Sequence, residues 1–311
     1  MTIRRAVLVC LLIGGLLSWP YMVGGYWLSL LTQILIFGIV ALSVDLLLGH
    51  AGLFSLCQAA FFSVAAYAVA IGQVKYGLGH LQAIGLALFC GLTLGAIFGL
   101  SVRTRGVYFI LVTLAMGYIV WGIGYRWAGF TGGDSGITNI PVPTIGAFDL
   151  SQPKTFYYFL LLAVAVIVIA YYRLVTSPFG LVLRGIKSSE DRMRSLGYSP
   201  VTHLYIAFLI SSFISSCAGV LYVYFNKFVN PVSASLHVSV EVVVMAILGG
   251  SGTLIGPFIG AAAVLAMRNW ISGFFEMHLA VMGLAFIAVV LWAPNGLVGL
   301  FRRMTNRFKQ Q

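Results

Sequence analysis

Charged side chains are scarce in this chain: Asp, Glu, Lys and Arg together make up 8% of its 311 residues. A soluble domain carries about 25%, so a soluble fold of this composition would lack the polar groups to cover its surface. The formal charge of +11 does not indicate a nucleic-acid partner, because basic DNA-binding chains are not this apolar. We assign the excess cations to loops that lie beside the anionic lipids of a bilayer.

Common catalytic and metal-binding motifs are also absent. The sequence has no Gly-x-x-x-x-Gly-Lys-[Ser/Thr] loop for ATP, no His-Glu-x-x-His and no Gly-x-Ser-x-Gly. Its four cysteines, Cys10, Cys57, Cys90 and Cys217, are widely spaced within apolar stretches. That spacing predicts small buried hydrophobic residues and no disulfide framework. We therefore expect no catalytic residue, no metal and no cofactor in this chain.

What the sequence does contain is a series of long apolar runs, with 60% hydrophobic residues and a mean hydropathy of +1.02. A membrane-spanning helix needs about 20 apolar residues. About ten spans are expected, at residues 6–23, 28–48, 53–74, 81–101, 106–125, 156–172, 203–225, 238–250, 257–274 and 279–294. The predicted fold is all-α, a polytopic membrane helix bundle that forms one transmembrane domain over residues 1–311.

The first apolar run has the form of a signal peptide, since Arg4 and Arg5 precede it. It lacks an Ala-x-Ala cleavage pattern, so we interpret it as an uncleaved first span. Clusters of Lys and Arg then lie before the first span, between the fourth and fifth, between the sixth and seventh, and after the last. With a cytoplasmic N-terminus all of these clusters fall on one side, as the positive-inside rule requires. Both termini are thus predicted to be cytoplasmic, and the long loop at residues 126–155 to be periplasmic.

Small residues recur at helix-packing spacing in two of the expected spans. Gly91, Gly95 and Gly99 lie on one face of the fourth span, and Gly256 and Gly260 on one face of the ninth. Glycines four residues apart let two membrane helices approach closely. We expect these faces to be helix–helix contacts.

Two glycine-rich stretches, residues 49–58 and 249–257, interrupt apolar runs at comparable places and suggest a faint internal repeat. Inverted repeats with glycine-broken helices are typical of transporters, although a chain with 36 glycines also produces chance matches. The breaks either line a cavity at membrane depth or form tight turns at the membrane face. The candidate pathway or gating residues in them are Gly49, His50, Gly52, Ser55, Gly249, Gly252 and Thr253.

Two carboxylates lie inside apolar runs, Asp45 and Glu241. A charge at the bilayer centre costs about 2.5–3.5 kcal/mol on insertion scales, so each side chain should face the bundle interior or a partner subunit. Each is either a pathway or gating group or a structural hydrogen-bonding group. Glu241 lies near the start of its span, where an interfacial position is a further possibility.

Residues 177–198 carry the clearest helix signals outside the expected spans. Ser177 and Pro178 predict a helix start, and Gly197 predicts its end. Apolar and charged residues recur on different faces between them. A short two-faced helix of this kind lies on lipid headgroups or docks into another protein.

Several stretches taken together resemble the LivM-type permease subunits of branched-chain amino acid ABC importers. They are residues 46–56, 59–67, 105–114, 131–137, 177–187, 194–197, 241–257 and 293–301, in family order. The resemblance implies a second permease of the LivH type, two cytoplasmic subunits that bind the ATP, a periplasmic substrate-binding protein, and a bacterial inner membrane. It also implies that residues 180–197 are the coupling helix. Its candidate contact residues are Gly180, Arg184, Lys187, Glu190, Arg194 and Gly197.

Asp45, His50 and the Cys57-Gln58 pair depart from the family pattern, and they cluster around the first glycine break. The substrate therefore stays open among branched-chain amino acids, other amino acids, urea and short amides. Two other classes of protein also stay open. In an ion-coupled secondary transporter, Asp45 or Glu241 would couple protons or sodium. A membrane-embedded enzyme would need a reactive cluster, and the sequence shows none.

Overall fold

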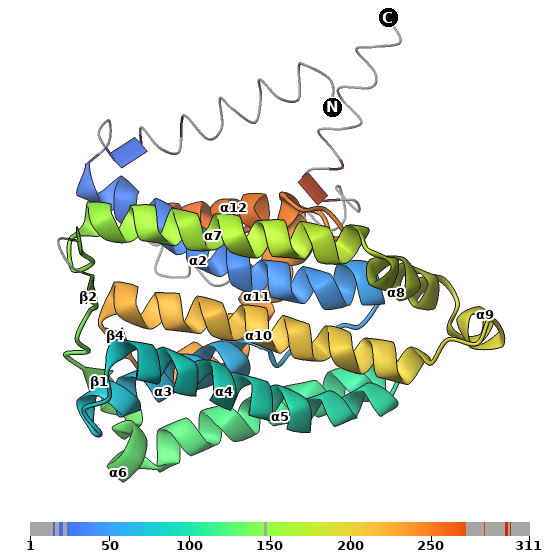
Figure 1. Ribbon diagram of the computed structural model, residues 1–311, viewed down its shortest axis with the longest axis horizontal. Helices are drawn as coiled ribbons and strands as arrows, with labels where there is room; N and C mark the ends of the chain where they lie inside the picture. The colour runs from blue at the N-terminus through green and yellow to red at the C-terminus, as the bar shows by residue number, and fades with distance from the viewer. Residues whose placement is uncertain are drawn as a thin grey trace, which may run out of the picture.

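The computed structural model describes residues 24–145 and 148–271, together with the isolated residues 15, 19, 20, 283, 296, 297 and 299. Within these ranges the chain is an all-α bundle of long helices that run side by side (Figure 1). This confirms the predicted fold class. Apart from those isolated residues, the first and tenth expected spans and the arginine clusters next to them lie outside the described residues.

The expected second to ninth spans each correspond to a helix. These are α2 (Gly25–Asp45), α3 (Gln58–Val74), α4 (His80–Gly99), α5 (Val107–Arg126), α7 (Pro153–Thr176), α10 (Pro200–Asn226), α11 (Leu236–Gly249) and α12 (Gly256–Ile271). In the described part of the chain, five helical segments are long and apolar enough to cross a membrane, those built on α2, α4, α5, α7 and α10. The helices α3 and α11 are apolar but shorter.

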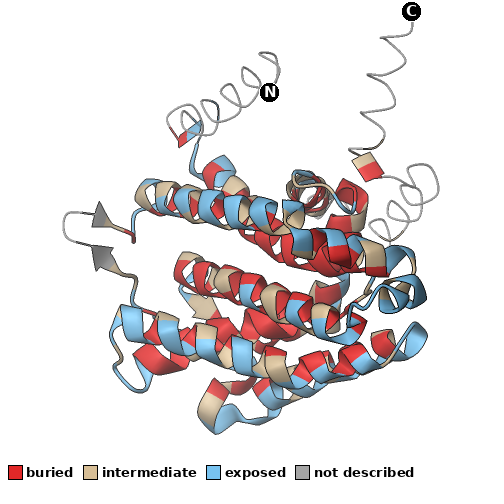
Figure 2. Ribbon diagram, turned by 45° about the vertical axis from the view of Figure 1, so that its right-hand side comes forward, coloured by how far each residue is buried: buried red, intermediate tan, exposed pale blue. Residues whose placement is uncertain are grey.

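The bundle has a buried centre and an apolar periphery. The membrane-length stretch of α2 is 78% buried and that of α10 is 67% buried, whereas those of α5 and α7 are 22% and 17% buried. Figure 2 shows the buried residues concentrated on the inner helices and the exposed ones on the outer faces. Because the exposed faces are themselves apolar, lipid or another membrane subunit must cover them.

Glycines allow the closest helix contacts, as the sequence predicts. On α4, added Cβ atoms at Gly91 and Gly95 would meet the Ser216 and Ser212 hydroxyls of α10. On α12, an added Cβ at Gly260 would meet the Met245 carbonyl oxygen of α11. Both glycine faces are therefore helix–helix contacts in this fold.

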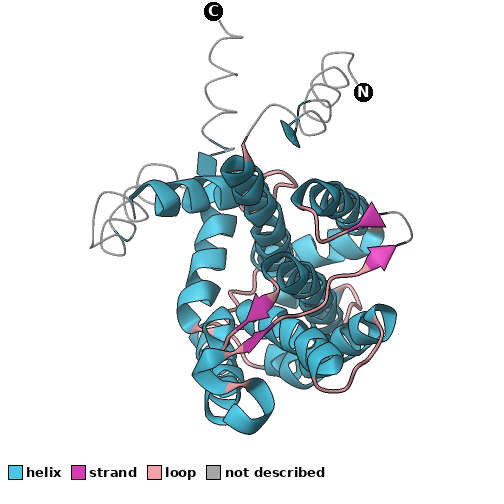
Figure 3. Ribbon diagram, turned by 90° about the vertical axis from the view of Figure 1, so that its left-hand side faces the viewer, coloured by secondary structure: helices cyan, strands magenta, loops and turns pink. Residues whose placement is uncertain are grey.

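The two ends of the bundle differ. At one end lie the 3₁₀ turn η2 (Leu100–Arg103) after α4 and the short helices α8 (Pro178–Ser188) and α9 (Glu190–Ser195). At the other end lie α6 (Ala128–Thr131), the 3₁₀ turns η3 (Gly133–Ser135) and η4 (Pro231–Ala234), and two small antiparallel strand pairs (Figure 3). The pairs are β1 (Ile137–Thr138) with β4 (Phe228–Val229), and β2 (Thr144–Ile145) with β3 (Phe148–Asp149). The loop at residues 126–155 thus lies at the end opposite to α8 (Figure 1).

The segment at residues 177–198 departs from the single short helix that the sequence predicts. Ser189 adopts an extended conformation, with φ −163° and ψ 109°, and separates α8 from α9. Its side chain accepts a hydrogen bond from the backbone N–H of Arg192 and caps α9. The acidic residues Glu190 and Asp191 follow in the first turn of α9, where the helix dipole favours negative charge. The predicted end at Gly197 is confirmed by its φ of +86°.

Candidate functional site

Asp45 is fully buried where α2 ends and the chain continues as the π-helical turn η1 (Leu46–Ala51). Its Oδ1 accepts a hydrogen bond from the backbone N–H of Gly252 at 2.6 Å, and its Oδ2 accepts one from the Tyr171 hydroxyl at 2.8 Å. Tyr171 belongs to α7, and Gly252 belongs to the loop between α11 and α12. One buried carboxylate therefore joins three segments that are far apart in the sequence.

The two glycine-rich breaks meet at this carboxylate. An added Cβ at Gly49 would meet both the Asp45 Oδ1 atom and the backbone of Gly252. Gly52 and Gly252 have φ values of +76° and +80°, a region that side chains other than glycine rarely adopt. The sequence suggests only that the two breaks resemble each other. In the structure they are in direct contact.

Lys187 connects this contact to α8. Its Nζ donates a hydrogen bond to the Gly49 carbonyl oxygen at 2.7 Å. Its aliphatic stem lies beside Gly52, where an added Cβ would stand 3.0 Å from the Lys187 Cγ. We refer to Asp45, Gly49, Gly52, Tyr171, Lys187 and Gly252 as the glycine junction.

His50 borders the glycine junction without a hydrogen bond to it. Its Nε2 lies 3.8 Å from the Asp45 Oδ2, and its ring packs edge-on against Tyr171 with the ring centroids 6.1 Å apart. The Nδ1 atom is buried and has no hydrogen-bond partner among the described residues. His50 is therefore a packing neighbour of the carboxylate.

The other candidates in the two breaks lie outside the junction. The Ser55 hydroxyl lies 3.3 Å from the Cys57 sulfur. Thr253 donates to the Gly250 carbonyl oxygen and accepts from the backbone N–H of Gly256, so it orders the start of α12. Gly249 packs against the carbonyl oxygen of Gly256. These contacts stabilise the local chain path of each break.

Glu241 is buried on α11, and its partner is Arg268 on α12. The Nη1 atom of Arg268 lies 3.1 Å from Oε1 and 3.3 Å from Oε2 of the carboxylate. The Glu241 side chain is 3% exposed and the Arg268 side chain 33% exposed. Sequence reasoning missed this partner. The signal was available, because Arg268 is the one Lys or Arg inside an expected span, and intramembrane charges tend to pair with one another.

Replacing Arg268 with methionine is expected to destabilise the α11–α12 pair, because the Glu241 carboxylate then lacks its partner. The loss should be smaller than the about 3–5 kcal/mol typical of a fully buried pair, because a third of the Arg268 side chain is exposed. The double variant Glu241→Gln/Arg268→Met should recover most of the loss. Thermal unfolding of the detergent-extracted protein measures both effects, and equal melting temperatures for the single and double variants would contradict the assignment.

Glu190, a candidate coupling contact, is engaged within the chain. Its carboxylate accepts hydrogen bonds from Arg105, which precedes α5, and from Arg194 one turn along α9. The Arg105 contact joins α9 to the segment between α4 and α5. Gly180 also has an internal role, because its Cα packs against the Val175 carbonyl at the end of α7.

The exposed residues of α8 and of the segment after α9 form a different group. Leu183 and Ile186 are buried against the bundle, whereas Arg184 is exposed. Exposed apolar residues accompany the arginine. We define the docking surface as Leu181, Arg184, Leu196 and Tyr198, whose apolar members are 62%, 67% and 43% exposed. Asp191 and Arg192 of α9 are exposed as well. Exposed apolar and charged side chains on a segment between two spans suit contact with another protein.

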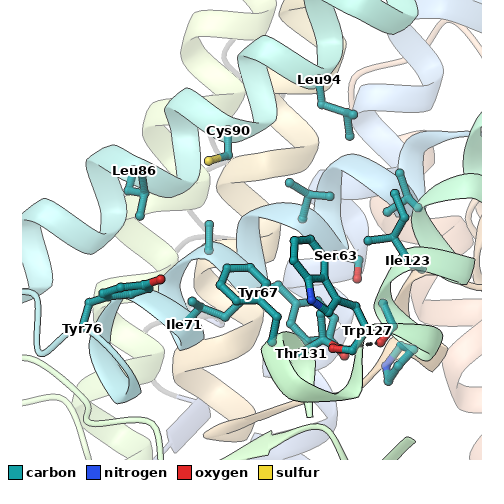
Figure 4. A pocket seen from close by; sticks show the side chains of 17 residues that line it. Ser63, Tyr67, Ile71, Tyr76, Leu86, Cys90, Leu94, Ile123, Trp127 and Thr131 are labelled. Carbon is teal, nitrogen blue, oxygen red and sulfur yellow. Dashed lines mark hydrogen bonds between the residues drawn. The ribbon is translucent and has the colours of Figure 1, made fainter. Parts of the chain in front are cut away.

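An apolar pocket of about 420 Å³ lies between α3, α4 and α5, near the end opposite to α8. Figure 4 shows its wall, with Tyr67, Leu86, Cys90, Ile123 and Trp127 directed toward the space. No residue that lines it is charged. It therefore offers no counter-charge for the ammonium or carboxylate of an amino acid.

The chain matches the family described as "Branched-chain amino acid transport system / permease component" over residues 26–290. It is 28% identical to the "High-affinity branched-chain amino acid transport system permease protein LivM" of Salmonella typhimurium, and 28% identical to the protein of the same name in Escherichia coli. Each similarity covers 97% of this chain and 76% of the relative.

A "Probable branched-chain amino acid transport permease protein LivM" of Methanocaldococcus jannaschii is 26% identical over 71% of this chain and 69% of its own length. No solved structure matches the chain. The family match covers most of the chain and includes every helix of the glycine junction. This multi-pass membrane protein therefore belongs to the family of permease components of branched-chain amino acid transport systems.

Proposed function

We propose that this chain is the LivM-type permease subunit of an ATP-driven importer of branched-chain amino acids in the bacterial inner membrane. The observation that carries the proposal is the similarity over 97% of the chain to two permeases of high-affinity branched-chain amino acid transport. The sequence has no nucleotide-binding loop of its own. ATP is bound and hydrolysed by partner subunits, and this chain is not an enzyme.

The proposed importer contains a second, LivH-type permease, two ATP-binding subunits and a periplasmic substrate-binding protein. The apolar outer faces of α5 and α7 support a membrane partner, because they are extensively exposed in the single chain. The docking surface supports contact with an ATP-binding subunit at the α8 end. Arg184 is an exposed charged residue of α8 that this surface offers to such a partner.

In the proposed topology the chain has about ten spans, with both termini and the α8 end in the cytoplasm and the loop at residues 126–155 in the periplasm. Basic residues support this orientation. Arg103, Arg105, Arg173, Arg184, Lys187, Arg192 and Arg194 lie at the α8 end, and Lys75, Arg126, Lys154 and Lys227 lie at the other. Loops rich in Lys and Arg stay on the cytoplasmic side.

An ion-coupled secondary transporter is the competing functional class. The environment of the two intramembrane carboxylates argues against this class. Both oxygens of Asp45 accept hydrogen bonds, and Glu241 is paired with Arg268. A carboxylate that carries protons or sodium has to exchange partners during transport. The contacts of Asp45 and Glu241 instead have the character of structural links.

The proposal is tested by affinity purification of the tagged chain in mild detergent, followed by mass spectrometry. We expect a related permease and two ATP-binding proteins to accompany the wild-type chain. ATP-dependent uptake of leucine, isoleucine and valine by the reconstituted complex then identifies the substrate, with urea and acetamide as competing solutes. Solute uptake by the chain alone, without ATP, would overturn the importer assignment.

The docking surface makes a separate prediction for the same purification. Arg184→Glu reverses the charge of the exposed arginine on α8 and should reduce the recovered ATP-binding subunits at least tenfold, which is about 1.4 kcal/mol of binding free energy. The matched control is Arg126→Glu, an exposed arginine at the opposite end of the bundle. Equal recovery with both variants would contradict the location of the docking surface.

A further inference from the structure

We propose that Lys187 is a positioning residue that passes the displacement of α8 to the rest of the glycine junction, and through Asp45 to the α11–α12 loop. The inference rests on the proposed function, in which α8 contacts an ATP-binding subunit. It assigns the transmission step to individual atoms: the Lys187 ammonium, the Gly49 carbonyl oxygen and the Asp45 carboxylate.

The first link joins α8 to the end of α2. The Lys187 ammonium donates to the Gly49 carbonyl oxygen at 2.7 Å, and its stem lies along Gly52. A hydrogen bond from a charged donor is about twice as strong as a neutral one. The accepting carbonyl belongs to the π-helical turn η1, and π-helical turns are often found at functional sites. Movement of α8 thus acts first on an irregular part of α2.

The second link joins that turn to the other glycine break. The position of an added Cβ at Gly49 is occupied by Asp45 Oδ1 and by the backbone of Gly252. Asp45 in turn accepts from the N–H of Gly252. With no space between these groups, Gly49 cannot shift toward them unless Asp45 and Gly252 shift as well. The loop that leads into α12 therefore moves together with the end of α2.

Tyr171 gives the junction a fixed point on α7. Its hydroxyl donates to the second Asp45 oxygen at 2.8 Å, and α7 runs directly into α8 through Ser177. The carboxylate is thus held from α7 on one side and from Gly252 on the other. A tilt of α8 about its connection to α7 moves Lys187 relative to Tyr171. This relative movement changes the contacts of Gly49 and Asp45 within the junction.

Space for such a tilt exists beside Lys187. A cavity of about 190 Å³ lies between the first glycine break, the segment before α5, and α8–α9, and Gly52, Lys187 and Glu190 are among the residues that line it. Arg105, which is paired with Glu190, also lines this cavity. The contact between α8 and the glycine junction is therefore close-packed at Gly49, whereas the cavity leaves free space next to Lys187. This combination lets α8 tilt while its contact with Gly49 is kept.

The test uses the complete importer reconstituted in vesicles, with ATP hydrolysis and leucine uptake measured on the same preparation. Lys187→Met keeps the apolar stem and removes the donor to Gly49. We expect it to assemble and hydrolyse ATP, while leucine imported per ATP falls at least tenfold. Lys187→Arg, which keeps a cationic donor, should restore most of this ratio. Lys227→Met, at the opposite end of the bundle, is the matched control and should leave it unchanged.

An unchanged ratio in Lys187→Met would overturn the inference and leave the proposed function intact. A wild-type complex that shows no ATP-dependent leucine uptake would overturn the proposed function together with the inference that rests on it. If Lys187→Met fails to insert, Lys187→Gln takes its place, because its amide is one atom shorter and falls short of the Gly49 carbonyl. A normal ratio in that variant would equally overturn the inference.

Discussion

Alanine at Gly260 is expected to lower the stability of the chain by about 1–3 kcal/mol, the usual effect of forcing an extra carbon into a packed interior. The added Cβ would meet the Met245 carbonyl oxygen and the backbone nitrogen of Gly249. Both are backbone atoms of α11, so no side-chain rotation relieves the collision. The two helices must separate.

Separation of α11 and α12 also disturbs the contact of α12 with α2. The Phe258 ring of α12 occupies the position of an added Cβ at Gly38, in the buried part of α2. A shift of α12 therefore opens a second interface. This second interface is the reason to expect a loss toward the upper end of the range.

Gly85→Ala is the matched control for Gly260→Ala. Gly85 lies within α4, and an added Cβ there would meet nothing within 4 Å. Alanine is favoured over glycine in a helix by about 1 kcal/mol, so this variant should be as stable as the wild type or slightly more stable. Thermal unfolding in detergent, followed by the loss of the monodisperse peak in size exclusion, compares the two. Equal melting temperatures for both variants would contradict the close backbone approach seen at Gly260.

The sequence predicts the helices well, because long apolar runs leave few alternatives to a spanning helix. Differences in the helix limits come from polar residues near the ends. The sixth expected span begins at residue 156, whereas α7 begins at Pro153 and includes Lys154 in its first turn. A proline at the first helical position and a cation near the headgroups are both compatible with a membrane helix. A prediction from hydropathy alone therefore gives a helix that is too short at this end.

The burial of Asp45 and Glu241 can be predicted from the sequence for a physical reason. Burial of a carboxylate in an apolar run requires partners, and this much follows from the sequence. The identity of the partners does not, because Tyr171 and Gly252 lie 126 and 207 residues away from Asp45. Likewise, Arg105 is 85 residues from Glu190. Such contacts depend on the packing of whole helices, which a single sequence does not reveal.

Leucine at Asp45 is expected to have the largest effect of any single change in the glycine junction. It removes the acceptor for both the Gly252 N–H and the Tyr171 hydroxyl, and each buried donor left unpaired costs about 1–3 kcal/mol. The expected loss of stability is therefore about 2–6 kcal/mol, enough to prevent assembly of the importer. The double variant Asp45→Leu/Tyr171→Phe removes one of the two unpaired donors and should recover about 1–3 kcal/mol.

Asparagine at Asp45 separates hydrogen bonding from charge, because it has nearly the same shape. Its carbonyl oxygen can accept from the Gly252 N–H, and its amide can donate to the Tyr171 hydroxyl, which then acts as the acceptor. Both links of the junction persist, so Asp45→Asn should assemble normally and keep its ATP-dependent uptake within a few-fold of the wild type. Normal assembly with complete loss of uptake would instead show that the negative charge itself acts in gating or in the pathway. Uptake in vesicles, normalised to the amount of assembled complex, decides between a carboxylate that holds the junction together and one that acts on the solute.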